Sequence, residues 1–142
     1  MEEFEYIKGY ENLYKINKLG KIFSCIYKKE MVQMMTADGY LYVHLSKEGK
    51  RYKGYIHRLL GKQYLENLDN KPEIDHIDRN KLNNDLINLR WVTRLENARN
   101  KSNYKDNLTP EQLEARKART RERAKLWARK NRELKKNILI KE

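Results

Sequence analysis

The chain of 142 residues contains a single cysteine, Cys25, and only two prolines. One cysteine excludes an intrachain disulfide and a zinc site built from cysteines of one chain. No apolar run approaches the roughly 18 residues that a membrane-spanning helix needs. The first ten residues, MEEFEYIKGY, are acidic and lack the apolar core of a secretion signal. We therefore expect a protein that is neither secreted nor embedded in a membrane.

Acidic side chains are too few to balance the basic ones. Twenty Asp and Glu stand against 32 Lys and Arg, which gives a formal net charge of +12. Residues 103–142 alone hold thirteen basic and six acidic side chains, a net of +7. A strongly basic protein commonly binds a polyanion, most often nucleic acid. Composition by itself does not separate a nuclease from a ribosomal protein or a transcription factor.

Glycine and aromatic residues are confined largely to the first half. All six Gly precede residue 62, and nine of the ten Tyr and both Phe precede residue 65. Residues Lys21–Tyr27 are strand-like, Tyr40–Leu45 alternates apolar with polar or aromatic side chains, and Arg51–Tyr55 follows a Glu-Gly turn. These patterns predict a small antiparallel sheet.

The second half has helical spacing. Apolar residues within 55–65 recur at intervals of three and four, which predicts a short amphipathic helix. Trp91-Val92 reads as a strand. Thr93 and Glu96 then form a capping box, so a helix is expected to begin near Arg94.

The C-terminal segment predicts a long basic helix. Thr109 and Pro110 suit a helix start, and Leu113 to Leu134 contains no Gly or Pro and is rich in Ala, Arg, Lys and Glu. Its apolar stripe is thin, with Trp127 the one large aromatic. Such a helix buries little against its own domain, and we expect it to lie on a partner.

The segment 73–101, EIDHIDRNKLNNDLINLRWVTRLENARNK, is the most informative. Asp75 and His76 are adjacent, Asn88 follows in a second strand region, and Asn97 lies in the predicted helix. In an extended strand Asp75 and His76 point to opposite faces, so that one can bind a metal ion and the other can address a water molecule.

The chemistry of these side chains favours phosphodiester hydrolysis. Asp75 and Asn97 offer hard oxygen ligands, which suit Mg²⁺ or Mn²⁺ better than Zn²⁺. With an unperturbed pKa of about 6.5, His76 can act as a general base at neutral pH. We expect the Asn88 amide to tie the connecting loop together and to orient the His76 ring.

Simpler interpretations apply to the neighbours of this set. Asn83 and Asn84 are interpreted as turn residues. His57 is interpreted as a packing or capping residue of its helix, and Trp91 as a core residue beneath the metal motif.

Several of these pieces occur together in the order known from one family. Its motif elements here are His57-Arg58-Leu59-Leu60, Asp75-His76-Ile77-Asp78, Asn83-Asn84, Asn88-Leu89-Arg90-Trp91-Val92-Thr93 and Glu96-Asn97. Together they resemble the HNH endonuclease motif, in the variant that begins with Asp-His and ends with Asn, as in phage homing and free-standing HNH endonucleases.

A second resemblance covers the start of the chain. Its elements are Ile7-Lys8-Gly9-Tyr10-Glu11, Leu13-Tyr14, Leu19-Gly20-Lys21-Ile22 and Ser24. They are similar to the nuclease-associated modular domain that often precedes the HNH motif. Phe4 stands where that domain usually has Trp, and Asn17-Lys18 where Ser-Asn is usual. These departures affect packing or DNA contact and leave the catalytic set intact.

The resemblance implies an α+β protein: a small N-terminal antiparallel β-sheet module over 1–54, a central ββα-metal (HNH) nuclease domain over 55–102, and a basic helical tail over 103–142. It implies His76 as general base, Asn88 as central loop residue of the catalytic set, and Asp75 and Asn97 as ligands of one Mg²⁺ or Mn²⁺. Basic residues expected to contact DNA are Lys21, Arg58, Arg90, Arg94, Arg99, Arg116, Arg119, Arg123, Arg129 and Lys130.

The predicted function is metal-dependent hydrolysis of duplex DNA by a homing-type endonuclease. We expect a monomer that nicks one strand, with a dimer or two events needed to cut both, and a location in the cytoplasm of a host cell of a phage or virus. Two alternatives remain at this stage: a non-catalytic DNA-binding protein that retains the scaffold, and a ribosomal-type RNA-binding protein. The second leaves Asp75, His76 and Asn97 without a purpose.

Overall fold

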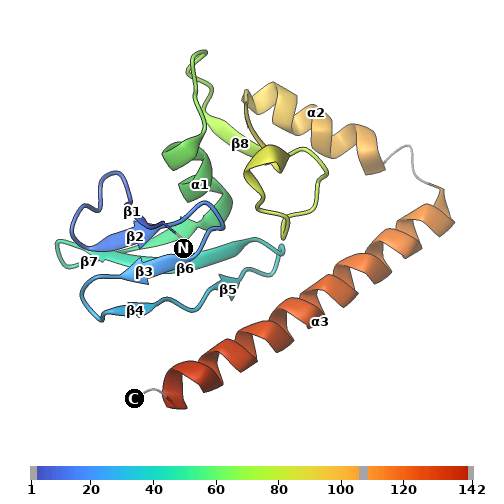
Figure 1. Cartoon of the computed structure of the whole chain (residues 1–142). Coiled ribbons are helices and arrows are strands. Elements are labelled where there is room, and N and C mark those ends of the chain that lie inside the picture. Colours follow the sequence, from blue (N-terminus) through green and yellow to red (C-terminus); the bar gives the residue numbers. More distant parts are fainter. Residues whose placement is uncertain (1–2, 106–108, 141–142) are drawn as a thin grey trace. The chain divides into compact units, whose positions relative to one another are not determined.

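A computed structural model describes residues 3–105 and 109–140 (Figure 1). Its internal contacts divide the chain into two units, Met1–Arg94 and Leu95–Glu142. The first unit holds three antiparallel sheets and one α-helix, and the second holds helical segments. The predicted α+β class is therefore correct.

The first sheet is built from four short strands in sequence order. They are β1 (Glu5–Tyr6), β2 (Tyr14–Ile16), β3 (Ile22–Ser24) and β4 (Lys29–Glu30). Strand β3 is shorter than the predicted strand Lys21–Tyr27, which is a correction. The chain turns after Ser24 because the Tyr27 N–H donates to Ser24 Oγ (3.3 Å), a local bond that replaces strand pairing.

The second sheet contains the alternation that was read from the sequence. Its strands are β5 (Met34–Met35), β6 (Leu41–Lys47) and β7 (Lys50–Tyr55), in that order. Leu41, Val43 and Leu45 are buried on one face of β6, as predicted. Glu48 and Gly49 close the β6–β7 hairpin with positive φ angles of 53° and 73°, the pattern of a two-residue turn that matches strand twist.

Helix α1 (Ile56–Tyr64) joins both sheets to one core, and its presence confirms the helix predicted over 55–65. The Tyr64 hydroxyl donates to the Ile16 carbonyl of β2 (3.0 Å). At Gly20, in the β2–β3 turn, a Cβ would lie 2.9 Å from Ile56, so only glycine fits this close approach. The most deeply buried apolar side chains come from the first sheet, the second sheet and α1: Ile16, Ile22, Val43, Leu45, Ile56 and Leu60.

A third, two-stranded sheet packs on α1 and carries the residues of interest. It pairs β8 (Glu73–His76) with β9 (Leu89–Val92), and the 3₁₀ turn η1 (Leu86–Asn88) precedes β9. The Trp91 indole N–H donates to the Leu65 carbonyl just after α1 (3.2 Å). Residues 1–94 therefore form a single packed unit, and the predicted three-part division at 54/55 and 102/103 stays a prediction.

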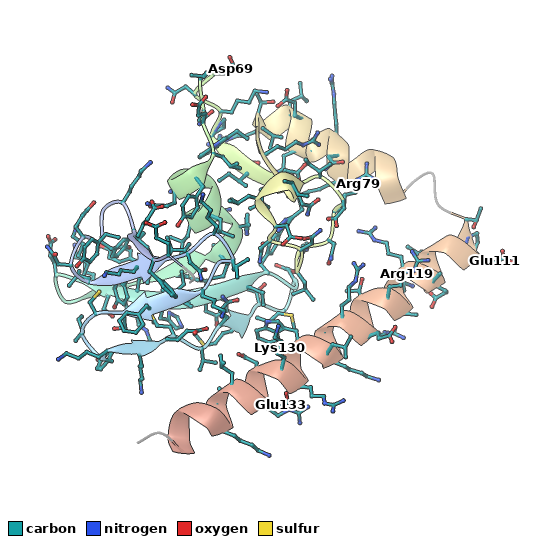
Figure 2. The ribbon with its side chains drawn as sticks, viewed as in Figure 1. Asp69, Arg79, Glu111, Arg119, Lys130 and Glu133 are labelled. Atoms are coloured by element: carbon teal, nitrogen blue, oxygen red, sulfur yellow. The ribbon has the colours of Figure 1, made fainter. Side chains whose placement is uncertain are left out.

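The two long helices begin where the capping sequences predict. Helix α2 spans Arg94–Lys105, directly after Thr93, and α3 spans Pro110–Ile140, directly after Thr109. Figure 2 labels Arg119 and Lys130, both exposed, on α3. Among the helices of the described residues, none combines the length and apolarity that a bilayer crossing requires.

Candidate active site

The β8–β9 hairpin fixes the directions of Asp75 and His76. Asp75 pairs with Arg90 in the register, and His76 pairs with Leu89. Side chains alternate along a strand, and burial alternates here too: Ile74 and His76 are buried, whereas Glu73 and Asp75 are of intermediate exposure. The prediction that these two side chains point to opposite faces of one strand agrees with this burial pattern.

Asn88 holds the loop that joins the two strands. Its Oδ1 accepts the backbone N–H of Asp78 (3.0 Å), and its Nδ2 donates to Asp78 Oδ1 (3.0 Å) and to the Asn83 carbonyl (2.8 Å). Partial burial raises the pKa of Asp78, but hydrogen bonds from Asn83, from the Asn80 N–H and from Asn88 outweigh it and lower that pKa. The amide therefore ties the loop together, as the sequence predicted.

The predicted contact between Asn88 and the His76 ring is wrong. The His76 ring bonds through Nε2 to Oδ1 of Asn84 (2.9 Å). Both Nδ2 hydrogens of Asn88 are donated to the loop, to Asp78 Oδ1 and the Asn83 carbonyl, and its Oδ1 accepts the Asp78 N–H, so these contacts hold the amide in the loop and not at the ring. Asn84, interpreted from sequence as a turn residue, is the side chain that orients the imidazole.

The His76 ring lies in an aromatic wall that the sequence did not predict. Its ring centroid is 4.9 Å from that of His57 and 6.2 Å from that of Tyr40. His57 and Tyr40 are themselves 5.1 Å apart. His57 is thus a packing residue, as one of the two interpretations held, and no side-chain cap is found at the start of α1.

The surroundings of the two rings lower the pKa of both imidazoles. Burial lowers the pKa of His57 to about 3, with smaller contributions from His76 and Arg58. Burial also lowers the pKa of His76, while the hydrogen bond to Asn84 and the carboxylates of Asp75 and Asp78 oppose that change. A neutral imidazole is the form that can accept a proton.

Asp75 lies beside a cation across the hairpin. Its Oδ2 is 3.2 Å from Nη2 of Arg90, and the Asp75 side chain is 11% exposed against 45% for Arg90. Arg90, expected to contact DNA, is therefore also an ion-pair partner of the predicted metal ligand. Asn97 lies in the first turn of α2, in the second unit, so its pairing with Asp75 at a metal ion stays a prediction.

The donor chemistry fits a hard divalent cation. Asp75 supplies carboxylate oxygens and Asn97 an amide oxygen, which are the ligand types of Mg²⁺ and Mn²⁺. Within residues 3–105 and 109–140 there is no group of three or more His, Cys, Asp or Glu side chains placed to hold an ion.

The other basic residues of the prediction are distributed over both units. Lys21 is half-buried before β3, and the exposed side chains Arg58, Arg90 and Arg94 belong to the first unit. The second unit carries Arg99 on α2 and Arg116, Arg119, Arg123, Arg129 and Lys130 on α3. Of this set, the structure brings Arg58 and Arg94 to one pocket, together with Lys62, which the sequence reasoning missed. The spacing of Arg58 and Lys62, four residues apart on one helix, is the pattern that could have found it.

Comparison with known proteins places these residues in a recognised domain. The family model for HNH endonuclease matches residues 54–99, and the NUMOD4 motif matches residues 2–46. The chain is 37% identical over 98 residues to DNA endonuclease I-HmuI of Bacillus phage SP01, covering 69% of this chain and 56% of that protein. It is 41% identical over 86 residues to the uncharacterized HNH endonuclease L245 of Acanthamoeba polyphaga mimivirus, covering 61% of this chain and 26% of that protein.

A solved structure shares the fold. It is described as DNA binding and cleavage by the HNH homing endonuclease I-HmuI, and it superposes with a TM-score of 0.66 at 32% identity. The match covers 81% of this chain and 66% of the other. The chain thus spans about half the length, or less, of the two relatives named above.

Proposed function

Because the chain belongs to the HNH endonuclease family, we propose that it is a divalent-metal-dependent endonuclease that hydrolyses phosphodiester bonds of duplex DNA. The observation that carries this proposal is the hairpin β8–β9, where Asp75 and the buried, hydrogen-bonded His76 lie on opposite faces of one strand. Such a pair can bind an ion on one side and activate water on the other.

His76 is proposed as the general base, acting through Nδ1. Asn84 Oδ1 can only accept a hydrogen bond, so the bond at Nε2 favours the tautomer with its proton on Nε2. The lone pair then lies on Nδ1, which has no hydrogen-bond partner among the described residues. In this role Nδ1 takes a proton from the water that attacks phosphorus, and the bond to the leaving oxygen of the DNA breaks.

Asp75 and Asn97 are proposed to hold one Mg²⁺ or Mn²⁺. When bound, such an ion stabilises negative charge on the phosphate and on the leaving oxygen. Asn88 contributes by keeping the loop between the strands in one conformation, and Asn84 by fixing the ring of the base. Both act through other groups and are therefore positioning residues.

Duplex DNA is proposed as the partner. The net charge of +12, with +7 in residues 103–142, supports a polyanionic substrate. The relative I-HmuI is named a DNA endonuclease, and its solved structure concerns DNA binding and cleavage. We further propose the homing-type role, a monomer that nicks one strand, a location in the host cell of a phage or virus, and the three-part division at residues 54/55 and 102/103.

Supercoiled plasmid tests the proposal directly. Purified protein is incubated with plasmid and Mg²⁺ or Mn²⁺, beside an EDTA sample, a His76→Ala variant and a His44→Ala variant. His44→Ala is the control because His44 lies on β6, outside the β8–β9 hairpin that carries Asp75 and His76. We expect conversion to open circle that requires both metal and His76 and is unchanged in His44→Ala. Tight binding in a gel shift without any conversion would instead indicate a DNA-binding protein that retains the scaffold.

A further inference from the structure

A pocket of about 190 Å³ lies between α1 and the β8–β9 hairpin. Arg58 and Lys62 of α1 and Arg94, after β9, line it together with Glu73 and Trp91. All these residues belong to the first unit, and none of the proposed catalytic or metal-binding side chains is among them.

The three cations of this pocket are not neutralised by the protein. The side chains of Arg58, Lys62 and Arg94 make no hydrogen bond or ion pair with any residue in 3–105 or 109–140. The Arg58 guanidinium lies over the ring of Tyr55, 5.0 Å from the ring centroid. With one carboxylate, Glu73, in the wall, the formal charge of the lining side chains is +2. Three cationic side chains against one carboxylate make the pocket electropositive, which favours an anionic ligand.

The side chains that line the pocket favour a phosphate group over a nucleobase as the ligand. The Trp91 N–H is used by the Leu65 carbonyl (3.2 Å), so it does not donate into the pocket. Guanidinium and ammonium groups recognise phosphate oxygens. At about 190 Å³, the pocket is large enough to admit a phosphate group.

The position of the pocket along β8 relates it to the candidate active site. Glu73 of the pocket wall and Asp75 lie on the same face of the strand, two residues and therefore about 6.6 Å apart. A DNA strand whose scissile phosphate meets Asp75 and His76 therefore brings another of its phosphates toward Arg58, Lys62 and Arg94.

We propose that Arg58, Lys62 and Arg94 form an anchor site for one non-scissile backbone phosphate of the DNA being cleaved. The inference rests on the proposed nuclease function and extends it, since it assigns Lys62 and a discrete pocket to substrate binding. The anchor positions the duplex on the hairpin and does not touch the reacting atoms, so its removal weakens binding and leaves the chemical step unchanged.

The test compares two triple variants of the full chain. Arg58→Ala/Lys62→Ala/Arg94→Ala removes the anchor, and Lys28→Ala/Lys50→Ala/Arg51→Ala removes the same charge from exposed positions outside the pocket. Affinity for a labelled duplex is measured by fluorescence anisotropy between 50 and 200 mM salt, and plasmid nicking gives KM and kcat. Circular dichroism confirms that each variant is folded.

Loss of one phosphate contact lowers the slope of log K against log salt by about 0.9. We expect that change in the anchor variant. From 50 to 200 mM salt, the factor by which its affinity falls should then be about 3.5 times smaller than the factor for wild type. Its KM should be raised and its kcat retained. Arg58→Lys/Arg94→Lys, which keeps the charges, should keep the slope. Equal slopes in the anchor and control variants, or a loss confined to kcat, would overturn the proposal. Because anisotropy does not depend on cleavage, a wild-type protein that binds without nicking would refute the nuclease function separately from the anchor.

Discussion

The contact between α1 and β8 gives the sharpest structural prediction, through Gly61. This glycine is buried on α1 against Ile74 of β8. A Cβ added at Gly61 would overlap Ile74 Cδ1 and lie 3.0 Å from Cγ1. Ile74 is only 7% exposed, so its side chain has little room to move aside.

The magnitude for Gly61→Ala follows from two opposing terms. Alanine gains about 1 kcal/mol over glycine in a helix interior. Forcing one extra methyl into a packed core costs about 1–3 kcal/mol, and the overlap with Ile74 Cδ1 places this substitution in the upper half of that range, at about 2–3 kcal/mol. We expect a net loss of about 1–2 kcal/mol in the free energy of unfolding, accompanied by slower DNA cleavage, because β8 carries Asp75 and His76.

Urea denaturation of Gly61→Ala, Ile74→Val and the double variant measures this contact. Ile74→Val deletes the Cδ1 that the new methyl would overlap, at a cost of about 0.5–1.5 kcal/mol by itself. The double variant should therefore be more stable than the sum of the two single losses predicts. A Gly61→Ala protein that is as stable as wild type or more stable, or strictly additive losses, would refute the packing described here.

Four further outcomes are expected. Asn88→Ala should lower the free energy of unfolding by about 3 kcal/mol in urea, since three hydrogen bonds of about 1 kcal/mol each are lost; a loss below about 1 kcal/mol would contradict the loop-tying role. Asn84→Ala should reduce kcat about tenfold and abolish the Nε2–H tautomer in the ¹⁵N spectrum of His76, whereas Asn84→Asp, which keeps an acceptor, should retain both. Stability should fall as pH drops from about 6.5 toward 3, with a slope of up to about 1.4 kcal/mol per unit, because the unfolded chain binds a proton at His57 that the folded chain excludes; His57→Phe should flatten the urea-derived profile in this window. Deleting residues 104–142 should weaken DNA binding and flatten its salt dependence while metal-dependent cleavage at high DNA concentration persists, and an unchanged slope would show that the tail contacts no phosphates.

Local chemistry explains why several elements could be predicted. The alternation of Leu41, Val43 and Leu45 is a property of consecutive residues, and so is the capping box of Thr93 and Glu96. The opposite directions of Asp75 and His76 likewise follow from strand geometry alone. Each of these inferences needs only neighbours in the chain, and each agrees with the fold.

The partner of the His76 ring could not be predicted in the same way. The loop contains four asparagines, at positions 80, 83, 84 and 88. Because their side chains are identical, residue type does not indicate which of the four amides bonds to the His76 ring. Asn88 is drawn into the loop by Asp78 and the Asn83 carbonyl, which leaves Asn84 to meet Nε2. Which amide does which task depends on the closed conformation of the whole loop.

The sequence by itself determined the fold class, the strands and helices with strong periodicity, and the residue types proposed to hydrolyse a phosphodiester, because these depend on short-range spacing and side-chain chemistry. The tertiary structure alone decided that Tyr40 and His57 surround the His76 ring and that Lys62 joins Arg58 and Arg94 at one pocket. These groups lie up to 36 residues apart in the chain, and they meet only because α1 packs against both the β6–β7 sheet and the β8–β9 hairpin.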